Sequence, residues 1–243
     1  MQWRDDALIL GGRRFGESGL ILDLLTAKYG RRSGLVYGGA SHRKRAQYEA
    51  GNSLNVAWTA RLEEQLGRFE VAELTELRAA HYLDQPAALT AITAITTLLR
   101  EAVEEGDQAG SALYAPTTLL LDALQEWAVW PALYARWELG LLSALGFGLD
   151  LEQCALSGAT QGLTHVSPNT GRAVCGSEAE AYLERLFILP TFLLEPGAAA
   201  EIDDIRHALT LTGYFVEKRL FHALNRRLPP IRARLIEKFL LKT

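Results

Sequence analysis

The stretch LNVAWT, residues 54–59, decides the fold class of the first third of the chain. Leu54, Val56 and Trp58 are large and apolar, and each is followed by a smaller or more polar residue. A period of two is that of a β-strand with one buried face, because successive side chains point to opposite sides. We therefore expect a strand at about residues 52–62.

Four similar runs surround this stretch, and glycine-containing breaks separate them. The expected strands are at about residues 3–14, 19–28, 32–39 and 66–76. Together with 52–62 they make five short strands, which suit a small barrel better than a sandwich. The leading example is the five-stranded OB-fold, which binds oligonucleotides across its strands and nearby loops.

From about residue 80 the apolar residues recur at helical spacing. We expect helices at about 88–103, 116–127, 131–145, 178–187, 201–226 and 231–241, with an irregular insert at about 150–178. Prolines near their starts are tolerated in a first turn and support several of these helices. The expected fold class is multi-domain α+β, with an OB-fold barrel over 1–78 and an α-helical domain over 79–243.

The net charge of −4 hides a segregation along the chain. Residues 1–61 carry a net +5, residues 62–216 a net −15 and residues 217–243 a net +6. Basic segments of this kind point to a polyanionic partner such as nucleic acid. The alternative is that the basic and acidic segments face each other inside the fold.

Composition places the chain among soluble cytoplasmic proteins. Only two cysteines occur, which is no disulfide framework and fits a reducing compartment. The first residues contain two acids before a short apolar run, which is wrong for a signal peptide. No run reaches the about 18 uncharged apolar residues of a membrane span.

No enzyme motif appears. The chain lacks the phosphate-binding glycine loops, the metalloprotease motif and the nucleophile elbow, and no two of its histidines stand three or four residues apart. A hydrolase that assembles its site from distant residues stays possible. We expect no catalytic residue and no cofactor.

The irregular insert is the best place for a metal. Cys154 and Cys175 each begin a C-x-x-X pair, whereas a structural zinc ribbon needs a cysteine at the last position of both pairs. Ser157 and Glu178 stand at those positions. Serine is a poor zinc ligand, and Cys154, Cys175, His165 and Glu178 would be an unusual ligand set. We expect an insert without metal, held as a turn by packing.

The basic residues of the first segment lie at or beside the expected turns of the barrel. We expect them to converge on one rim and bind phosphates without sequence preference, with aromatic residues stacking on bases. Gly38 and Gly39 lack a Cβ, so a phosphate or neighbouring backbone could approach closely. The candidate nucleic-acid-binding residues are Arg13, Arg14, Lys28, Arg31, Arg32, Tyr37, Gly38, Gly39, Arg43, Lys44 and Arg45. The competing interpretation makes Phe15 and Tyr48 core residues and 43–45 a solvated loop.

Several short stretches together carry a family likeness. In chain order they are Trp3-Arg4-Asp5-Asp6, Gly16-Glu17-Ser18, Tyr29-Gly30-Arg31, the basic loop after Gly38-Gly39, Gly51-Asn52, Trp58-Thr59-Ala60-Arg61-Leu62, Leu66-Gly67, Leu149-Asp150-Leu151, Ser157-Gly158-Ala159-Thr160 and Val166 to Val174. Their order and spacing resemble those of the RecO family of bacterial recombination mediators, over nearly the whole chain.

The resemblance implies an OB-fold, a helical domain and a zinc-finger-like insert. It implies a non-enzymatic mediator of DNA repair and homologous recombination that binds single- and double-stranded DNA and anneals complementary strands. The implied partners are RecR and the acidic C-terminal tail of single-strand binding protein, with RecA loaded indirectly. The sequence departs from the family at Ser157 and Glu178, where zinc-binding members carry cysteines, and at Tyr37, where many carry a base.

The basic C-terminal segment is a candidate partner-binding groove. A cationic, apolar groove suits an acidic peptide that ends in a hydrophobic residue and a free carboxylate. The candidate residues are Phe215, Arg219, Leu220, Arg226 and Arg227. The alternative is an amphipathic helix that packs Phe215 and Leu220 inside. A different function for the whole chain, a protein–protein adaptor whose barrel binds no nucleic acid, also stays open.

Overall fold

The structure is a computed structural model that describes residues 1–42, 44–62, 65–195 and 197–240, except the side chains of 45, 71, 72 and 240. The chain forms two compact units. The first contains Met1–Gln125 and Pro229–Lys238, and the second contains Glu126–Leu228 and Phe239. The expected boundary between residues 78 and 79 stays a prediction.

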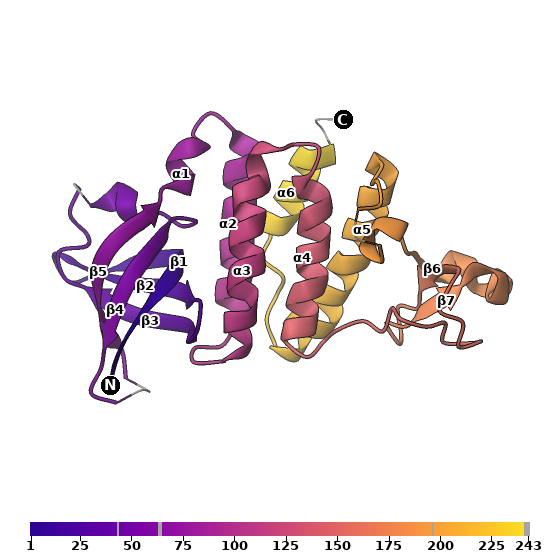
Figure 1. Ribbon diagram of the computed structural model, residues 1–243, viewed down its shortest axis with the longest axis horizontal. Helices are drawn as coiled ribbons and strands as arrows, with labels where there is room; N and C mark the ends of the chain where they lie inside the picture. The colour runs from indigo at the N-terminus through magenta and orange to yellow at the C-terminus, as the bar shows by residue number, and fades with distance from the viewer. Residues whose placement is uncertain (43, 63–64, 196, 241–243) are drawn as a thin grey trace. The chain divides into compact units, whose positions relative to one another are not determined.

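Five strands near the N-terminus form a closed barrel in the order β1-β2-β3-β5-β4 (Figure 1). They are β1 (Gln2–Phe15), β2 (Gly19–Thr26), β3 (Gly30–Val36), β4 (Ser53–Thr59) and β5 (Gly67–Glu76). Neighbouring strands pair antiparallel except β3 and β5, which pair parallel. All five expected strands are confirmed, with ends shifted by a few residues, and the chain is of mixed α and β structure.

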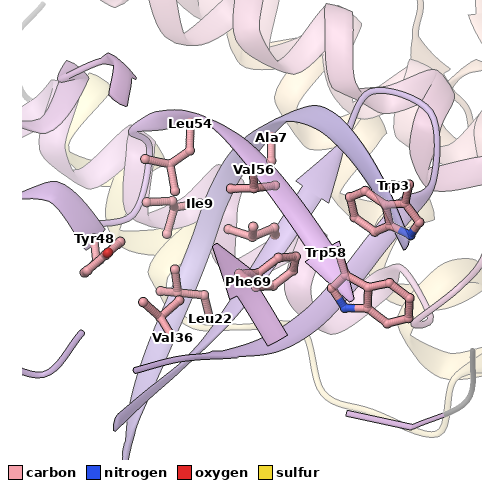
Figure 2. Packing of buried hydrophobic residues seen from close by; sticks show 11 residues of the cluster. Trp3, Ala7, Ile9, Leu22, Val36, Tyr48, Leu54, Val56, Trp58 and Phe69 are labelled. Carbon is pink, nitrogen blue, oxygen red and sulfur yellow. The ribbon is translucent and has the colours of Figure 1, made fainter. Parts of the chain in front are cut away.

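Aromatic side chains fill one part of the barrel core (Figure 2). The Trp3 ring stacks on Tyr29 with centroids 4.4 Å apart and on Trp58 at 5.3 Å. Gly67 makes room for this stack, because a Cβ there would lie 2.0 Å from Nε1 of Trp58. Trp58 is 1% exposed, so the alternation that indicated this strand does place its apolar face in the core.

Helices of the first unit lie beside the barrel (Figure 1). They are α1 (Arg78–His81), α2 (Pro86–Ala102), α3 (Ala109–Asp122) and the 3-10 helix η2 (Ala123–Gln125). The sequence placed the start of the third of these at Pro116, which is wrong, because Pro116 lies inside α3. The helix begins at Ala109, and Gly110 in its first turn packs against β3, where a Cβ would lie 3.2 Å from the Cα of Gly30.

A buried arginine ties these helices to the barrel. The Nε of Arg78 donates to Asp122 at 2.6 Å, and its Nη1 donates to the Ser53 hydroxyl at 2.5 Å. Arg78 is 6% exposed, whereas the Asp122 side chain is 57% exposed, so only the arginine side of this ion pair is buried. The contact therefore fixes the start of α1 and the end of α3 against β4.

The second unit contains two long helices and the insert (Figure 1). Its elements are α4 (Trp130–Ala144), β6 (Leu163–Val166), β7 (Ala173–Cys175), η3 (Gly176–Glu178), η4 (Glu180–Arg185), β8 (Phe187–Ile188), η5 (Thr191–Leu193), α5 (Ile202–Phe215) and the π-helix η6 (Val216–Phe221). Helix α6 (Ile231–Leu240) follows near the C-terminus, and its residues up to Lys238 belong to the first unit.

One expectation for this unit is wrong. The helix expected at 178–187 is a pair of short 3-10 segments, because the following residues pair as β8 with β6 in a three-stranded sheet of order β7-β6-β8. The helix expected at 201–226 is confirmed; it is α-helical from Ile202 to Phe215 and continues as the π-helix η6. It ends at Asn225, whose φ of 53° is the left-handed conformation that commonly terminates helices.

Candidate nucleic-acid interface

Two turns meet at one end of the barrel. The register pairs Arg14 with Leu20 and Leu20 with Val36, so the β1–β2 turn lies beside the loop that follows β3. The backbone N–H of Ala40 donates to the carbonyl of Ser18 at 3.1 Å and joins the two segments. Residues far apart in sequence are thereby held on one rim.

This rim exposes both cations and aromatic rings. Arg13 and Arg14 are exposed, and the side chains of Phe15 and Tyr37 are 51% and 66% exposed. The guanidinium carbon of Arg68, at the start of β5, lies 5.9 Å from the Tyr37 ring centroid. We call this surface, made of Arg13, Arg14, Phe15, Tyr37 and Arg68, the open rim.

The composition of the open rim suits a nucleic acid. Guanidinium groups pair with phosphates, and exposed rings offer faces on which bases stack. Phe15 is exposed, so its expected alternative role in the core is wrong, whereas Tyr48 is 8% exposed and does belong to the core. Arg68 was missed by the sequence reasoning, although it directly follows a glycine break. Glu70 forms an ion pair with Arg68 and partly offsets its positive charge.

The two glycines of the loop differ from each other. Gly38 has a φ of 66° and nothing within 4 Å of a Cβ, so its backbone is open to approach. Gly39 is buried, and a Cβ there would lie 2.9 Å from the Cβ of Leu20. The expectation that a phosphate approaches both is therefore wrong for Gly39, whose role is to let the loop pack on β2.

The basic run after the glycines is only partly described. Lys44 is exposed, and its backbone N–H donates to the carbonyl of Ser41 at 3.0 Å. Arg43 lies outside the described residues, and so does the side chain of Arg45, whose backbone begins the 3-10 helix η1 (Arg45–Tyr48). Their contribution to binding stays a prediction.

The remaining basic candidates lie at the other end of the β2–β3 hairpin. Thr26 pairs with Gly30 there, whereas Leu20 pairs with Val36 at the open rim, a separation of about 20 Å at the rise of a strand. Lys28, Arg31 and Arg32 therefore do not share the open rim, and the expectation of a single rim is wrong. We call Lys28, Tyr29, Arg31 and Arg32 the aromatic end, because they adjoin the Trp3 stack.

Two of these cations are engaged inside the fold. Arg32 is 8% exposed; its guanidinium carbon lies 5.9 Å from the Trp58 ring centroid, and its Nε donates to the carbonyl of Tyr29 at 3.2 Å. Arg31 lies 3.6 Å from a carboxylate oxygen of Asp23. Lys28 is exposed. Arg32 is thus a core residue in this structure rather than a surface contact.

The C-terminal candidates also divide between interior and surface. Phe215 is 0% exposed and Leu220 is 1% exposed. Both are packed inside, as expected for the alternative of an amphipathic helix, so a peptide on the surface cannot contact them. Arg219 lies 4.7 Å from the Phe215 ring centroid and donates to the carbonyl of Asn169 at 3.3 Å. Arg226 and Arg227 are exposed. A partner role stays a prediction for the three arginines.

The cysteines of the insert are close partners. The backbone N–H of Cys175 donates to the Cys154 Sγ at 3.2 Å, and the Cys175 thiol donates to the carbonyl of Gln161 at 3.4 Å. Burial raises the pKa of the Cys154 thiol, but hydrogen bonds from the Ser157 hydroxyl and from nearby backbone N–H groups outweigh burial and lower the pKa to about 6. Burial also raises the pKa of Cys175.

This arrangement does not fit a zinc ion. A structural site needs four ligands, and Ser157 and Glu178 are exposed on the two positions where cysteines are missing. His165 shares a hydrogen bond of 2.9 Å with the Thr164 hydroxyl. Among the described residues, no group of three or more His, Cys, Asp and Glu side chains is placed to hold a metal.

Comparison with known proteins decides the family. A model described as "Recombination protein O N terminal" matches residues 1–78, and one described as "Recombination protein O C terminal" matches residues 83–228. The chain belongs to the recombination protein O family. The suggested resemblance to RecO is thereby confirmed over both parts of the chain.

Individual relatives agree with this assignment. A protein of Hyphomonas neptunium named DNA repair protein RecO is 66% identical over 238 residues, which are 98% of each chain. Proteins of the same name from Ruegeria sp. and Methylorubrum populi are 43% and 41% identical, over 98% and 97% of each chain. In the part of the recombination protein O chain that the structure describes, no helix is long and apolar enough to cross a bilayer.

Proposed function

We propose that this protein is a non-enzymatic mediator of DNA repair and homologous recombination. It binds single- and double-stranded DNA without sequence preference, anneals complementary strands and acts in the cytoplasm. With RecR, it helps to load RecA onto DNA that is covered by single-strand binding protein. Family membership and the names of the relatives support this proposal.

The observation that carries the DNA-binding part is the open rim. Two exposed arginines and one exposed ring at the end of β1, and a second exposed ring after β3, stand beside turns that a backbone hydrogen bond joins. Phosphate neutralisation is independent of sequence, and base stacking tolerates every base. Annealing then needs only a cationic surface that reduces the repulsion between two strands while base pairing supplies the specificity.

We propose further that the barrel is an OB-fold and the insert a metal-free relative of a zinc finger. The strand order β1-β2-β3-β5-β4 with closure between β4 and β1 supports the first proposal. The hydrogen bond between Cys154 and Cys175, at the end of β7, supports the second. Packing around Cys154, Val174 and Ala179 stabilises the insert in place of a metal.

Titration of a labelled oligonucleotide at two salt concentrations tests the proposal. We expect an affinity that falls with salt and does not change with base sequence, with annealing of complementary strands and no nucleotide hydrolysis. Failure to bind either strand form at low salt would contradict the mediator role and favour the adaptor function. Hydrolysis of a nucleotide or of the DNA would favour an enzyme instead.

A further inference from the structure

A polar groove of about 710 Å³ lies within the first unit, between the barrel and helix α2. It adjoins the open rim because Arg14 belongs to both. The residues that line it are Leu10, Gly11, Gly12, Arg14, Leu20, Gly39, Ala40, Tyr48, Glu49, Ala50, Thr93, Thr96, Thr97 and Arg100. None of them is among the binding residues expected from the sequence except Arg14 and Gly39.

The α2 wall of the groove is a polar stripe. Thr93, Thr96, Thr97 and Arg100 follow the spacing i, i+3, i+4 and i+7, which places them on one face of the helix. The buried residues of α2 are otherwise small or apolar apart from Thr90. A helix face of this kind normally packs against the sheet with apolar residues, so a stripe of hydroxyl and guanidinium groups beside an open groove points to a polar ligand.

Glycine on the opposite wall holds the arginine in place. A Cβ at Gly11 would lie 2.7 Å from Nη1 of Arg100, so the glycine leaves room for the guanidinium to lie across β1. The side chain of Arg100 is 38% exposed, and its 3.8 Å ion pair with Glu101 is too long for a hydrogen bond. An exposed ion pair contributes little, so Arg100 keeps its capacity to bind an anion.

The polar groups match the parts of a nucleotide. The exposed hydroxyl of Thr93 donates to the carbonyl of Leu89 at 2.8 Å, so its oxygen retains lone pairs that accept hydrogen bonds, whereas Thr96 is buried. Acceptors suit the N–H groups of bases, and the guanidiniums of Arg14 and Arg100 suit phosphates. Glu49 is the one acid among the described lining residues, so the arginines outnumber it.

We propose that this groove takes unpaired nucleotides of a single strand that continues from the open rim, with Arg100 on a phosphate. The inference rests on the proposed DNA binding and adds a site that distinguishes single strands from duplex. A volume of about 300–1,000 Å³ encloses a small molecule, so one or two nucleotides enter, whereas a base-paired helix does not. The groove therefore contributes to single-strand affinity only.

Fluorescence anisotropy of the full chain with labelled oligothymidine and with a duplex of equal length tests this. We expect Arg100→Gln to weaken single-strand binding about tenfold, the effect of one charge-assisted hydrogen bond, and Arg100→Lys to restore part of it. Duplex affinity should change less than about twofold, as for a distant exposed charge. The matched control is Arg4→Gln, because Arg4 is an exposed arginine of β1 that lies outside the groove.

A second variant covers the case in which Arg100→Gln does not fold. Thr93→Val keeps the shape of an exposed side chain and removes its acceptor, and we expect about threefold weaker single-strand binding with unchanged thermal stability. Equal losses of single-strand and duplex affinity, or no loss of single-strand affinity in either variant, would contradict the proposal that the groove binds a single strand. Either result would leave the mediator role intact. A wild-type chain that binds no DNA would overturn both.

Discussion

The open rim and the aromatic end lie at opposite ends of one β-hairpin and carry similar sequences, yet their cations are used differently. At the open rim Arg13 and Arg14 are exposed beside Phe15 and Tyr37. At the aromatic end Arg32 is buried over a tryptophan, and Arg31 is paired with Asp23. A basic residue near a turn is thus available to a polyanion only where the fold provides no partner of its own.

The surroundings explain the difference. Acidic groups gather near the aromatic end, where Asp5 accepts a hydrogen bond of 2.7 Å from the Lys28 backbone and Glu105 accepts one of 2.7 Å from the Ser33 backbone. The Trp3 stack adds ring faces that attract guanidinium groups. At the open rim Arg68 is paired with Glu70, but Arg13 and Arg14 are exposed to solvent, so their charges can act over distance.

Substitution of Arg32 should cause the largest change in free energy, and it tests whether the aromatic end stabilises the fold. Arg32→Ala removes a hydrogen bond from a charged group and a contact with the Trp58 ring, and we expect a loss of about 2–4 kcal/mol in the free energy of unfolding. Chemical denaturation measures it. A stable variant with reduced DNA affinity would show instead that Arg32 is a binding residue and would break the comparison.

Removal of the open-rim charges tests the other end. The double substitution Arg13→Ala and Arg14→Ala should weaken DNA binding at least about tenfold and lower the salt slope by roughly 1.4 to 1.8, because each phosphate contact contributes about 0.7 to 0.9. Anisotropy titrations over a salt series give both quantities. The midpoint of thermal unfolding should not change. An unchanged salt slope of DNA binding would show that DNA does not contact the open rim.

The exposed ring of the open rim should have a smaller effect. Phe15→Ala should weaken single-strand binding by about 1 to 2 kcal/mol, since one base loses its stacking surface, and the salt slope should stay the same. Phe15→Tyr is the matched control because it keeps the ring. Equal affinity of both variants would show that no base stacks on Phe15.

The smallest effect should come from Lys28, the exposed cation of the aromatic end. Lys28→Ala should change DNA affinity less than about twofold and leave the free energy of unfolding within about 0.5 kcal/mol, as is usual for surface substitutions. The same titration and denaturation experiments measure these quantities. A loss as large as that of the Arg13 and Arg14 pair would mean that DNA reaches both ends of the barrel.

The cysteine pair shows a second limit of sequence motifs. The C-x-x-X spacing drew attention to Cys154 and Cys175, yet it did not show that Cys154 accepts a hydrogen bond from the Cys175 backbone. Likewise the 3.6 period indicated α2, but a period gives no sign that its polar stripe borders a groove with β1. Both facts depend on contacts between residues that lie far apart along the chain.

The sequence by itself determined the five strands, most of the long helices, the position of the insert and the family, because strand and helix periods and short motifs are local properties. Only the tertiary structure decided which basic residues are exposed. That outcome depends on strand register, which places Arg13 and Arg14 at one end of a hairpin and Arg32 over Trp58 at the other. Local patterns carry no record of such long-range pairing, because a side chain's partners come from distant strands.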